Sequence, residues 1–383
     1  MSWPLVSIKS VSKVTTGKTP SKKVEEYFGG DIPFISPSEL GDAPFVLNSK
    51  QTLTESGASK IKLVPKNSVL VCCIGSLGKL AIADRELGTN QQINSVTFDE
   101  SKIDYKYGYY ALSRLKPILE SMAPATTVAI VNKSKFEELE IPLPPLDEQK
   151  RIAAILDKAD AIRRKRQQAI RLADDFLRSV FLDMFGDPVT NPKGWEVKKL
   201  GELTTIRRGA SPRPIANFMG GDVPWIKIGD GSKGDQVYLN STKEHVTQEG
   251  ASKSVFLAKG SLIFANCGVS LGFARILNIA GCIHDGWLSI ENIDKGLNKI
   301  FILKWINQLT LYFRRIAPDG TQPNLNSGIM RDQEIILPPI EIQNKFEDVL
   351  LKHERALAKL NDGLVSANEA LNSLSQKAFA GEL

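Results

Sequence analysis

The sequence has 383 residues, of which 42% are hydrophobic and 24% are charged, a composition that is ordinary for a globular protein. At roughly 100–200 residues per domain, this length exceeds a single core and predicts two or three domains. The sequence contains no apolar run of ~18 residues, and its first residues lack the basic and apolar regions of a signal peptide. We therefore expect a cytoplasmic protein with no membrane partner.

The net charge of +6 permits binding to nucleic acid, but many proteins that do not bind nucleic acid are equally basic. Four cysteines and three histidines are scattered along the chain without the spacing of metal ligands. The sequence therefore predicts no metal site, and it predicts buried free thiols in a reducing compartment.

The chain contains a long internal repeat. Trp3 is followed 14 positions later by Gly17, and Trp195 is followed 14 positions later by Gly209. Four further segments recur in the same order: residues 29–35 and 220–226, residues 68–78 and 261–272, the Ala-Pro pairs at 123–124 and 317–318, and the Leu-Pro-Pro triplets at 143–145 and 337–339. A period of about 192 residues is too long for a solenoid and indicates two whole domains of the same fold.

Each repeat unit begins with mixed β structure and ends in a long helix. Short apolar runs at residues 68–74 and 261–264 predict strands, and residues 105–122 and 299–316 predict shorter helices. The first long helix begins with prolines and acidic residues at 144–148, which suit a helix N-terminus, and stops at Gly186. The second runs from Pro338 to Gly381.

Both long helices carry an apolar seam with coiled-coil spacing. In the second helix the seam comprises Phe346, Leu350, His353, Leu357, Leu360, Leu364, Ala367, Leu371, Leu374 and Ala378. In the first helix it comprises Ile152, Ile155, Ala159, Ile162, Ala169, Ala173, Phe176 and Val180. Because a pseudo-twofold repeat presents its two helices in opposite directions, we expect an antiparallel pair.

These patterns predict an α+β protein with two similar mixed α/β domains separated by two long antiparallel helices that form a coiled coil. The expected boundaries are residues 1–143 for the first domain, 144–186 for the first long helix, 187–337 for the second domain and 338–383 for the second long helix.

Three segments carry a resemblance to a known family: residues 143–152 at the start of the first long helix, residues 183–196 at its end, and the C-terminal residues 377–383. In combination they resemble the specificity subunit of type I restriction–modification enzymes, and the duplicated plan matches over the whole chain. In that family each variable domain reads one half of a split site in double-stranded DNA, and the helices set the spacing between the half-sites. The second helix start departs mildly, with Ile-Glu-Ile-Gln-Asn at 340–344 in place of Leu-Asp-Glu-Gln-Lys at 146–150.

The resemblance also implies partners. The helices would bind modification (methyltransferase) subunits, and a translocating nuclease, the restriction subunit, would join the complex. Residues at the two helix starts are the expected partner contacts, namely Leu146, Gln149, Ile152, Ile340, Gln343 and Phe346. The chain itself would be non-catalytic and would hold no cofactor, because S-adenosylmethionine, ATP and Mg²⁺ would bind to the partner subunits.

Two other classes of function remain as alternatives: a single-chain DNA methyltransferase or nuclease, and a coiled-coil scaffold that binds proteins. The sequence lacks the Asn/Asp-Pro-Pro-Tyr/Phe motif of adenine methyltransferases and the Gly-Lys-Ser/Thr phosphate loop. The glycines at 229, 231 and 234 have the spacing of a nucleotide-binding loop, but a strand-like segment rather than a helix follows them. We therefore interpret them as a flexible loop.

Polar loops are the candidate DNA contacts. Arginine pairs with guanine or phosphate, amides pair with adenine, and Ser, Thr and Lys bind phosphates. The candidates are Lys18, Thr19, Lys22, Lys23, Ser76, Lys79, Arg207, Arg208, Ser211, Arg213, Thr321, Gln322 and Asn324. The alternative for each is a solvated surface turn. The basic run at residues 163–166 on the first helix is either a solvated helix face or a contact to phosphate or a partner.

Overall fold

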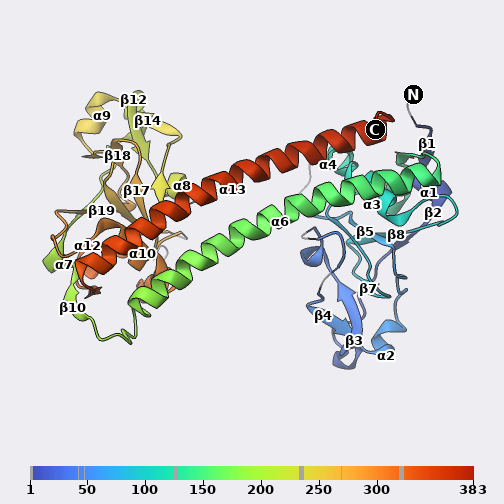
Figure 1. Ribbon diagram of the computed structural model, residues 1–383, viewed down its shortest axis with the longest axis horizontal. Helices are drawn as coiled ribbons and strands as arrows, with labels where there is room; N and C mark the ends of the chain where they lie inside the picture. The colour runs from blue at the N-terminus through green and yellow to red at the C-terminus, as the bar shows by residue number, and fades with distance from the viewer. Residues whose placement is uncertain are drawn as a thin grey trace. The chain divides into compact units, whose positions relative to one another are not determined.

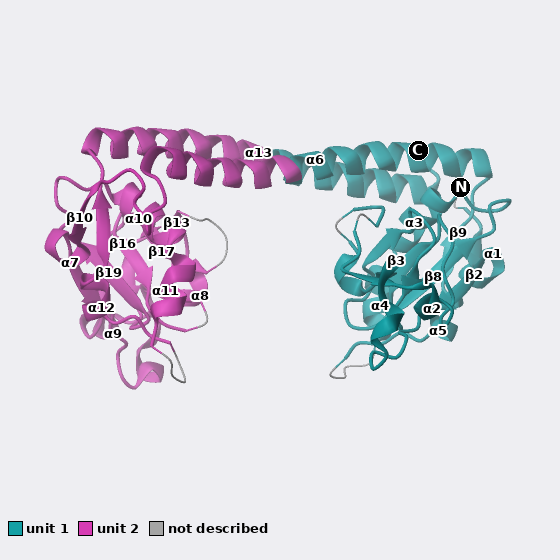
Figure 2. Cartoon of the chain, turned by 90° about the horizontal axis from the view of Figure 1, so that it is seen from below, with its two compact units in different colours: residues 1–167, 362–383 teal, residues 168–361 magenta. Residues whose placement is uncertain are grey.

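The computed structural model describes residues 3–41, 43–46, 48–123, 128–232, 237–268, 270–318 and 323–383. The chain forms two compact units: unit 1 comprises residues 1–167 and 362–383, and unit 2 comprises residues 168–361 (Figure 2). Each unit has an α+β fold. The borders between the units fall inside the long helices, so each unit contains one part of both helices. The compact units therefore differ from the expected division into two domains and two separate helices.

Unit 1 is built from short strands and helices (Figure 1). Its strands are β1 (Leu5–Ser7), β2 (Ser12–Thr16), β3 (Phe28–Ile35), β4 (Gln51–Leu53), β5 (Val69–Cys72), β6 (Leu80–Ile82), β7 (Gly88–Thr89), β8 (Ile93–Phe98) and β9 (Glu140–Pro142). Its short helices are α1 (Ile8–Val11), α2 (Glu55–Ala58), α3 (Tyr105–Ser113), α4 (Lys116–Met122) and α5 (Lys133–Glu137), with 3-10 turns at Glu25–Tyr27 and Pro37–Glu39.

Unit 2 repeats this plan. Its strands are β10 (Glu196–Lys199), β11 (Thr205–Arg208), β12 (Met219–Ile226), β13 (Tyr238–Leu239), β14 (Glu244–Val246), β15 (Val255–Leu257), β16 (Leu262–Ala265), β17 (Ala274–Leu277), β18 (Gly281–Ile283), β19 (Trp287–Glu291) and β20 (Glu334–Leu337). Its short helices are α7 (Leu200–Leu203), α8 (Ile228–Gly231), α9 (Gln248–Ser252), α10 (Lys299–Gln308), α11 (Thr310–Ile316) and α12 (Ser327–Arg331), with a 3-10 turn at Ile215–Phe218.

The sheets of the two units have the same strand order, and each of the two larger sheets of unit 2 has one additional edge strand, β13 or β15. Unit 1 has the sheets β2-β8-β5-β6 and β4-β3-β7 and the pair β1-β9. Unit 2 has β11-β19-β16-β17-β13, β14-β12-β18-β15 and β10-β20. The predicted strands at 68–74 and 261–264 are β5 and β16, which lie inside their sheets and are buried over their whole length. The glycines at 229 and 231, predicted from the sequence to be part of a flexible loop, instead belong to the helical turn α8. Gly234 lies outside the described residues.

The two shorter predicted helices are each divided in two. The segment at 105–122 forms α3 and α4, and the segment at 299–316 forms α10 and α11. Asp104 and Asn298 accept hydrogen bonds from the first free amides of α3 and α10, as N-cap residues do. Both helices therefore begin in the same way.

The long helices are α6 (Leu146–Phe185) and α13 (Ile340–Ala380). Each is followed by a glycine with positive φ, Gly186 at 79° and Gly381 at 77°, a conformation that ends a helix at low cost only for glycine. Within unit 1, Arg151 donates to the carbonyl of Leu383, and within unit 2, Phe181 packs edge-on against Phe346. The helix parts lie side by side in each unit (Figures 1 and 2).

The apolar seam of α13 is confirmed, because all of its predicted members are buried or half-buried. The predicted seam of α6 is wrong at Ile162 and Phe176, whose side chains are 53% and 57% exposed. The apolar residues that α6 buries near its two ends are Ile152, Ala153, Leu156, Leu177, Phe181 and Phe185, which join the cores of units 1 and 2.

Candidate nucleic-acid interface

In each unit, one tight loop follows the first strand of the larger sheet. Gly17 after β2 and Gly209 after β11 donate backbone hydrogen bonds to the carbonyls of Ile93 and Trp287. A Cβ at Gly17 would lie 2.1 Å from the backbone of Asn90, and a Cβ at Gly209 would lie 2.3 Å from that of His284. Only glycine permits this approach, so both loops are held against the segment that precedes β8 or β19.

A matched hydrogen bond between side chains then fixes each loop. In unit 1 the hydroxyl of Thr19 donates to Oε1 of Gln91 at 2.7 Å. In unit 2 the hydroxyl of Ser211 donates to Oδ1 of Asp285 at 2.8 Å. Thr19 and Ser211 occupy the same position in the repeat, and so do Gln91 and Asp285. The structure thus contains the same loop pairing twice, with a neutral acceptor in unit 1 and an acidic acceptor in unit 2.

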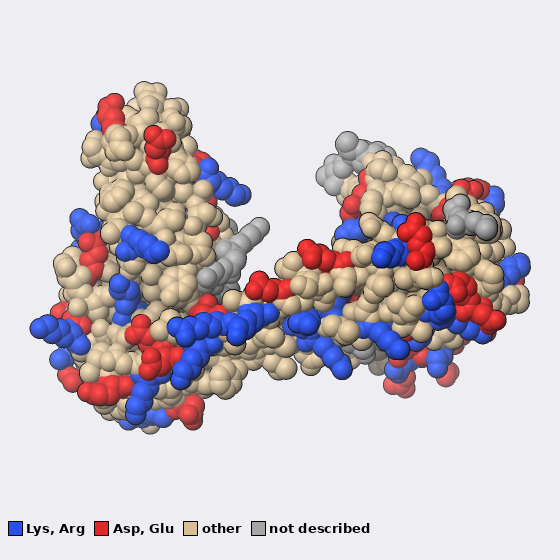
Figure 3. Space-filling model, turned by 45° about the horizontal axis from the view of Figure 1, so that its top comes forward, with Lys and Arg blue, Asp and Glu red and all other residues tan. Residues whose placement is uncertain are grey.

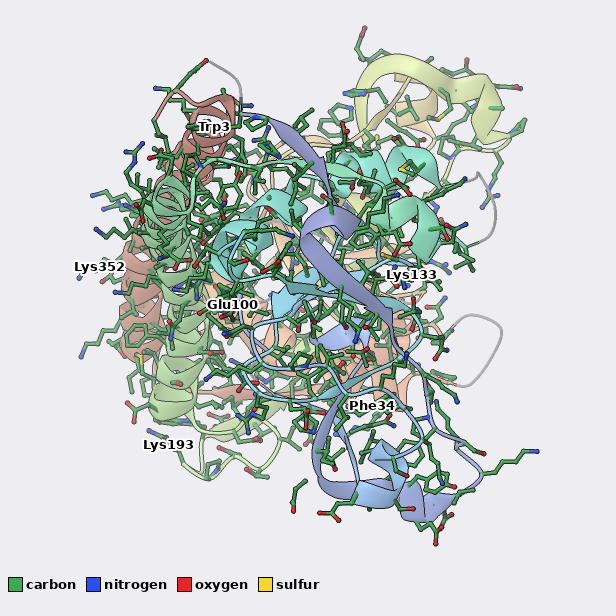
Figure 4. The ribbon with its side chains drawn as sticks, turned by 90° about the vertical axis from the view of Figure 1, so that its right-hand side faces the viewer. Trp3, Phe34, Glu100, Lys133, Lys193 and Lys352 are labelled. Atoms are coloured by element: carbon green, nitrogen blue, oxygen red, sulfur yellow. The ribbon has the colours of Figure 1, made fainter. Side chains whose placement is uncertain are left out.

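The loop pairing of unit 1 borders a polar pocket of about 470 Å³. Its lining residues are Thr19, Pro20, Lys22, Phe34, Ser36, Ser38, Glu39, Lys50, Gln51, Asn90, Gln91 and Gln92. Figure 4 shows Phe34 on the side of unit 1 away from α6. The pocket therefore lies on the strand side of the unit and is rich in amide and hydroxyl groups.

Amide hydrogen bonds organise the segment at residues 90–92. Nδ2 of Asn90 donates to Oε1 of Gln92 at 3.0 Å, and the backbone amide of Gln92 donates to Oδ1 of Asn90. Nε2 of Gln92 donates to the carbonyl of Ile74, at the start of the glycine loop that contains Ser76. Two loops that the sequence predicts separately, at residues 17–23 and 75–79, are therefore joined through this segment.

In unit 2 a carboxylate takes the place of the amides. Asp285 accepts from Ser211, contacts Nε2 of His284 at 3.0 Å, and lies 4.0 and 3.8 Å from the guanidinium groups of Arg208 and Arg213. Burial by itself raises the pKa of Asp285, but the Ser211 hydroxyl and the nearby positive charges lower it below its ordinary value. Asp285 is therefore ionised at neutral pH and holds the cations of this loop together.

Burial also lowers the pKa of His284, and the charges of Lys227, Arg213 and Arg208 act in the same direction against the opposing effect of Asp285. The imidazole is therefore neutral at pH 7, and its Nδ1 accepts a hydrogen bond from the amide of Gly286. The positive charge of this site comes from the arginines.

The side chains of the three predicted arginines do not lie on the same face of unit 2. Arg207 turns to the other face of β11, where it makes two hydrogen bonds to the carboxylate of Glu291, at 3.0 and 3.1 Å. Arg208, the next residue, donates through Nε to the carbonyl of Asp285. Neighbouring residues of a strand point to opposite faces. The predicted cluster therefore consists of Arg208, Ser211 and Arg213, while Arg207 lies outside it.

The other predicted DNA contacts occupy different positions. Lys18, Lys22 and Lys23 are exposed, and Lys22 lines the pocket of unit 1. Ser76 and Lys79 line a second concavity of about 360 Å³ with Lys116.

Asn324 lies beside the matching glycine loop of unit 2 and accepts from Nδ2 of Asn266 at 3.1 Å. Thr321 and Gln322 lie outside the described residues.

The sequence interpretation missed the residues that bring the loops together, namely Asn90, Gln91 and Gln92 in unit 1 and His284 and Asp285 in unit 2. A signal for them was present. Both segments directly precede a strand that pairs with the strand before the predicted loop, β8 with β2 and β19 with β11. Aligning the repeats through these strands would have placed the two segments opposite each other.

The predicted partner contacts need correction at four positions. Gln149 and Gln343 are fully buried, and each fixes its helix start with three hydrogen bonds to backbone groups at 2.7–2.9 Å. Ile152 and Phe346 are also fully buried, in the cores of units 1 and 2. These side chains stabilise the chain itself, whereas Leu146 and Ile340 are half-buried and stay predicted partner contacts.

Basic side chains follow the surface of the long helices (Figure 3). Within the predicted basic run on α6, Arg163 and Arg164 both bind the buried carboxylate of Asp160, at 2.6 and 2.9 Å. Both guanidinium groups are therefore bound to Asp160 within unit 1. Lys165 and Arg166 are the exposed cations of the run. On α13, exposed cations recur along one face at Lys345, Lys352, Arg355 and Lys359.

The described residues contain neither a metal cluster nor a membrane-spanning helix. Across these parts of the chain, no group of three or more His, Cys, Asp or Glu side chains has the geometry of a metal site. None of the helices in the same parts is long and apolar enough to cross a membrane.

The chain therefore carries the same polar loop pairing on two copies of one fold. The family model of the type I restriction modification DNA specificity domain matches residues 2–172 and 192–364. Because the two matches cover most of the chain, it belongs to the family of type I restriction–modification DNA specificity subunits.

The chain also matches curated relatives and solved structures over most of its own length and of theirs. The MjaIX specificity subunit of Methanocaldococcus jannaschii is 25% identical, with 100% of this chain and 93% of that protein covered. The MjaVIII specificity subunit of the same organism is 28% identical, over 91% and 85%. The S subunit of M. genitalium matches with a TM-score of 0.59 and 19% identity, over 98% of this chain and 96% of that one. A chain from a structural study of type I complex assembly matches with a TM-score of 0.62 and 16% identity, over 100% and 98%.

Proposed function

We propose that this chain is the non-catalytic DNA-reading subunit of a type I restriction–modification complex. Each unit reads one half of an asymmetric, bipartite site in double-stranded DNA, and the base pairs between the half-sites are not read. Modification subunits bound to the long helices methylate the site, and a restriction subunit cleaves DNA. S-adenosylmethionine, ATP and Mg²⁺ bind to these partners in the cytoplasm.

The matched loop pairing is the observation that supports this proposal. Thr19 with Gln91 and Ser211 with Asp285 present different polar groups on the same backbone frame. Base edges are distinguished by the donors and acceptors that a protein places opposite them. Two copies of one frame with different polar groups are therefore suited to two unlike half-sites.

The proposal is tested by mapping methylated adenines in DNA exposed to the purified chain, the modification subunits, or both. We expect methylation only with both, at one bipartite sequence. Methyl transfer by the chain alone would support the enzyme alternative. Assembly with partner proteins but no salt-sensitive, sequence-selective DNA binding would support the scaffold alternative.

A variant with altered helices tests how the half-sites are spaced. Because α6 and α13 each continue from one unit into the other, seven helix-forming residues are inserted in both, after Gln167 and after Asn361. Seven residues add about 10.5 Å to a helix, and base pairs rise about 3.4 Å each. The unread spacer should lengthen by about three base pairs while both half-sites keep their sequence. An unchanged spacer would contradict the role of the helices.

A further inference from the structure

The two matched sites differ in the hydrogen bonds that they can offer to a base pair. We propose that unit 1 reads an adenine in its half-site through Gln91, and that unit 2 reads a guanine through Arg208, with Asp285 as its positioning residue. This inference rests on the proposed function, and it adds which kind of base pair each unit recognises.

Gln91 is the amide of unit 1 that is presented outward. Its side chain is exposed, and the Thr19 hydroxyl occupies one lone pair of Oε1. Within the described residues, no hydrogen bond involves Nε2 of Gln91, so one acceptor position and two donors remain. Adenine presents an N6–H₂ donor beside the N7 acceptor in the major groove, and glutamine pairs with both.

The neighbouring amides hold this segment rather than read DNA. Asn90 and Gln92 are bonded to each other, and Gln92 is also bonded to the carbonyl of Ile74. Both are half-buried. Their mutual bonds fix the backbone on either side of Gln91 and so orient its side chain.

The carboxylate in the pocket of unit 1 does not read cytosine. Glu39 accepts from the backbone and hydroxyl of Ser36, the hydroxyl of Ser38 and the backbone of Lys50. Asp230 in unit 2 has the same role, because it accepts from the backbone of Lys227 and the hydroxyl of Thr242. Since Oε2 of Glu39 accepts three of these bonds and Oε1 accepts the fourth, this carboxylate is held by the chain itself, and we assign the choice of base to the amide of Gln91.

The geometry of unit 2 favours guanine. Nε of Arg208 is anchored on the carbonyl of Asp285 at 2.9 Å, and the side chain remains 48% exposed. The anchor leaves the two terminal nitrogens to donate to O6 and N7 of guanine, the commonest specific contact to a base. Arg213 is 76% exposed, and its guanidinium lies 3.8 Å from the carboxylate of Asp285. It therefore adds positive charge for the DNA phosphates beside this base pair.

Selection from a random duplex library by the assembled complex tests this assignment. The full chain is used as wild type, Gln91→Ala, Arg208→Ala and Asp285→Asn. Gln91→Ala should relax an A·T position in one half-site, and Arg208→Ala a G·C position in the other. Each preference should fall by about tenfold, within the range of about 5- to 150-fold that a bidentate contact supplies.

Arg207→Ala is the matched control, because Arg207 is the adjacent residue of β11 and is bonded to Glu291 on the opposite face. It should leave the base preference at every position within about twofold. Asp285→Asn keeps the backbone carbonyl that anchors Nε of Arg208 and removes the carboxylate charge 4.0 Å from its guanidinium, so it should relax the same G·C position less than Arg208→Ala does, and the double variant should match Arg208→Ala. Unchanged thermal unfolding of each variant shows that the fold is intact.

Three results would overturn the assignment: relaxation of a G·C position by Gln91→Ala, relaxation of an A·T position by Arg208→Ala, or no difference between Arg208→Ala and Arg207→Ala. In all of these the wild-type complex still selects a bipartite site, so the proposed function stands. If the wild-type complex selects no sequence, the proposed function fails, and this inference fails with it.

Discussion

The face of α6 in unit 1 and the corresponding face of α13 in unit 2 differ at matched positions. In unit 1, Asp157 accepts from Lys106 and from the hydroxyl of Tyr110, at 2.7 and 2.8 Å, and Asp160 binds two arginines. In unit 2 the corresponding residues are Leu351 and Glu354. The face there is open and forms a groove of about 840 Å³ between the long helices and α10–α11.

The residues under these faces are alike. Gln149 and Gln343 make the same three hydrogen bonds, and Asp104 and Asn298 cap the neighbouring helices. The two copies therefore share the groups that fix the backbone and differ in the groups at these matched helix positions. A duplicated fold can in this way present one closed, charged face and one open groove.

The largest expected effect is in the core below the groove. Phe346 packs edge-on against Phe181 and Phe185, with ring centroids 5.4 Å apart in both pairs, and Ile152 is its counterpart in unit 1. Phe346→Ala should lower the free energy of unfolding by about 4 kcal/mol and Ile152→Ala by about 3 kcal/mol, because the larger side chain leaves the larger cavity.

Denaturant unfolding checks this order. Four of the five tryptophans, Trp195, Trp225, Trp287 and Trp305, belong to unit 2, so fluorescence reports mainly on that unit. Far-ultraviolet circular dichroism reports on both. Fluorescence should therefore show a larger fall in the denaturation midpoint for Phe346→Ala than for Ile152→Ala. The opposite order would contradict the assignment of these two residues to separate cores.

The next effect tests whether the shared groups are equivalent. Gln149→Leu and Gln343→Leu each leave one amide and two carbonyls without their partner, which should cost about 3 kcal/mol of unfolding free energy. The two losses should agree within about 1 kcal/mol. Gln168→Leu, at an exposed position of α6, is the control and should change stability by less than about 0.5 kcal/mol. A loss in only one unit would show that the matched bonds differ in importance.

The smallest effect concerns the charged face of unit 1. Asp160 is 5% exposed and its carboxylate accepts from both Arg163 and Arg164. Asp160→Asn should lower the unfolding free energy by about 2 kcal/mol, since hydrogen bonds to charged groups are lost in a buried position. Asp175→Asn, at an exposed position of the same helix, serves as the control. Equal melting temperatures for the two variants would mean that the face of unit 1 is held by packing alone.

Sequence reasoning recovered what repeats along the chain. The duplicated Trp3 and Trp195, the prolines before the long helices and the strands at β5 and β16 were sufficient for the fold. In the candidate site, the loops at Thr19 and Arg208 were predicted from the sequence but Gln91 and Asp285 were not, and contact of the loops with DNA stays a prediction. These two residues act through contacts with residues more than 70 positions away, and local patterns do not report such contacts. Arg207 and Arg208 looked equivalent until the alternation of β11 separated them.

The ends of the chain meet in unit 1. The indole of Trp3 donates to the carbonyl of Ala378 at 2.9 Å, just as the indole of Trp195 donates to that of Phe185. In unit 2 a continuous chain brings the tryptophan to the helix end, whereas in unit 1 the two partners come from opposite termini.

This arrangement bears on how the protein is made. On the ribosome, residues 1–167 emerge first but cannot complete their core until Ala378 and Phe379 arrive. At roughly 5–20 residues per second, the intervening residues 168–361 take about 10 to 40 s to synthesise. Unit 2, which is continuous in sequence, can fold during that delay. Unit 1, whose larger segment is made before unit 2, is therefore completed after it, and a nascent chain released before residues 362–383 would lack the core contacts of Ala378 and Phe379.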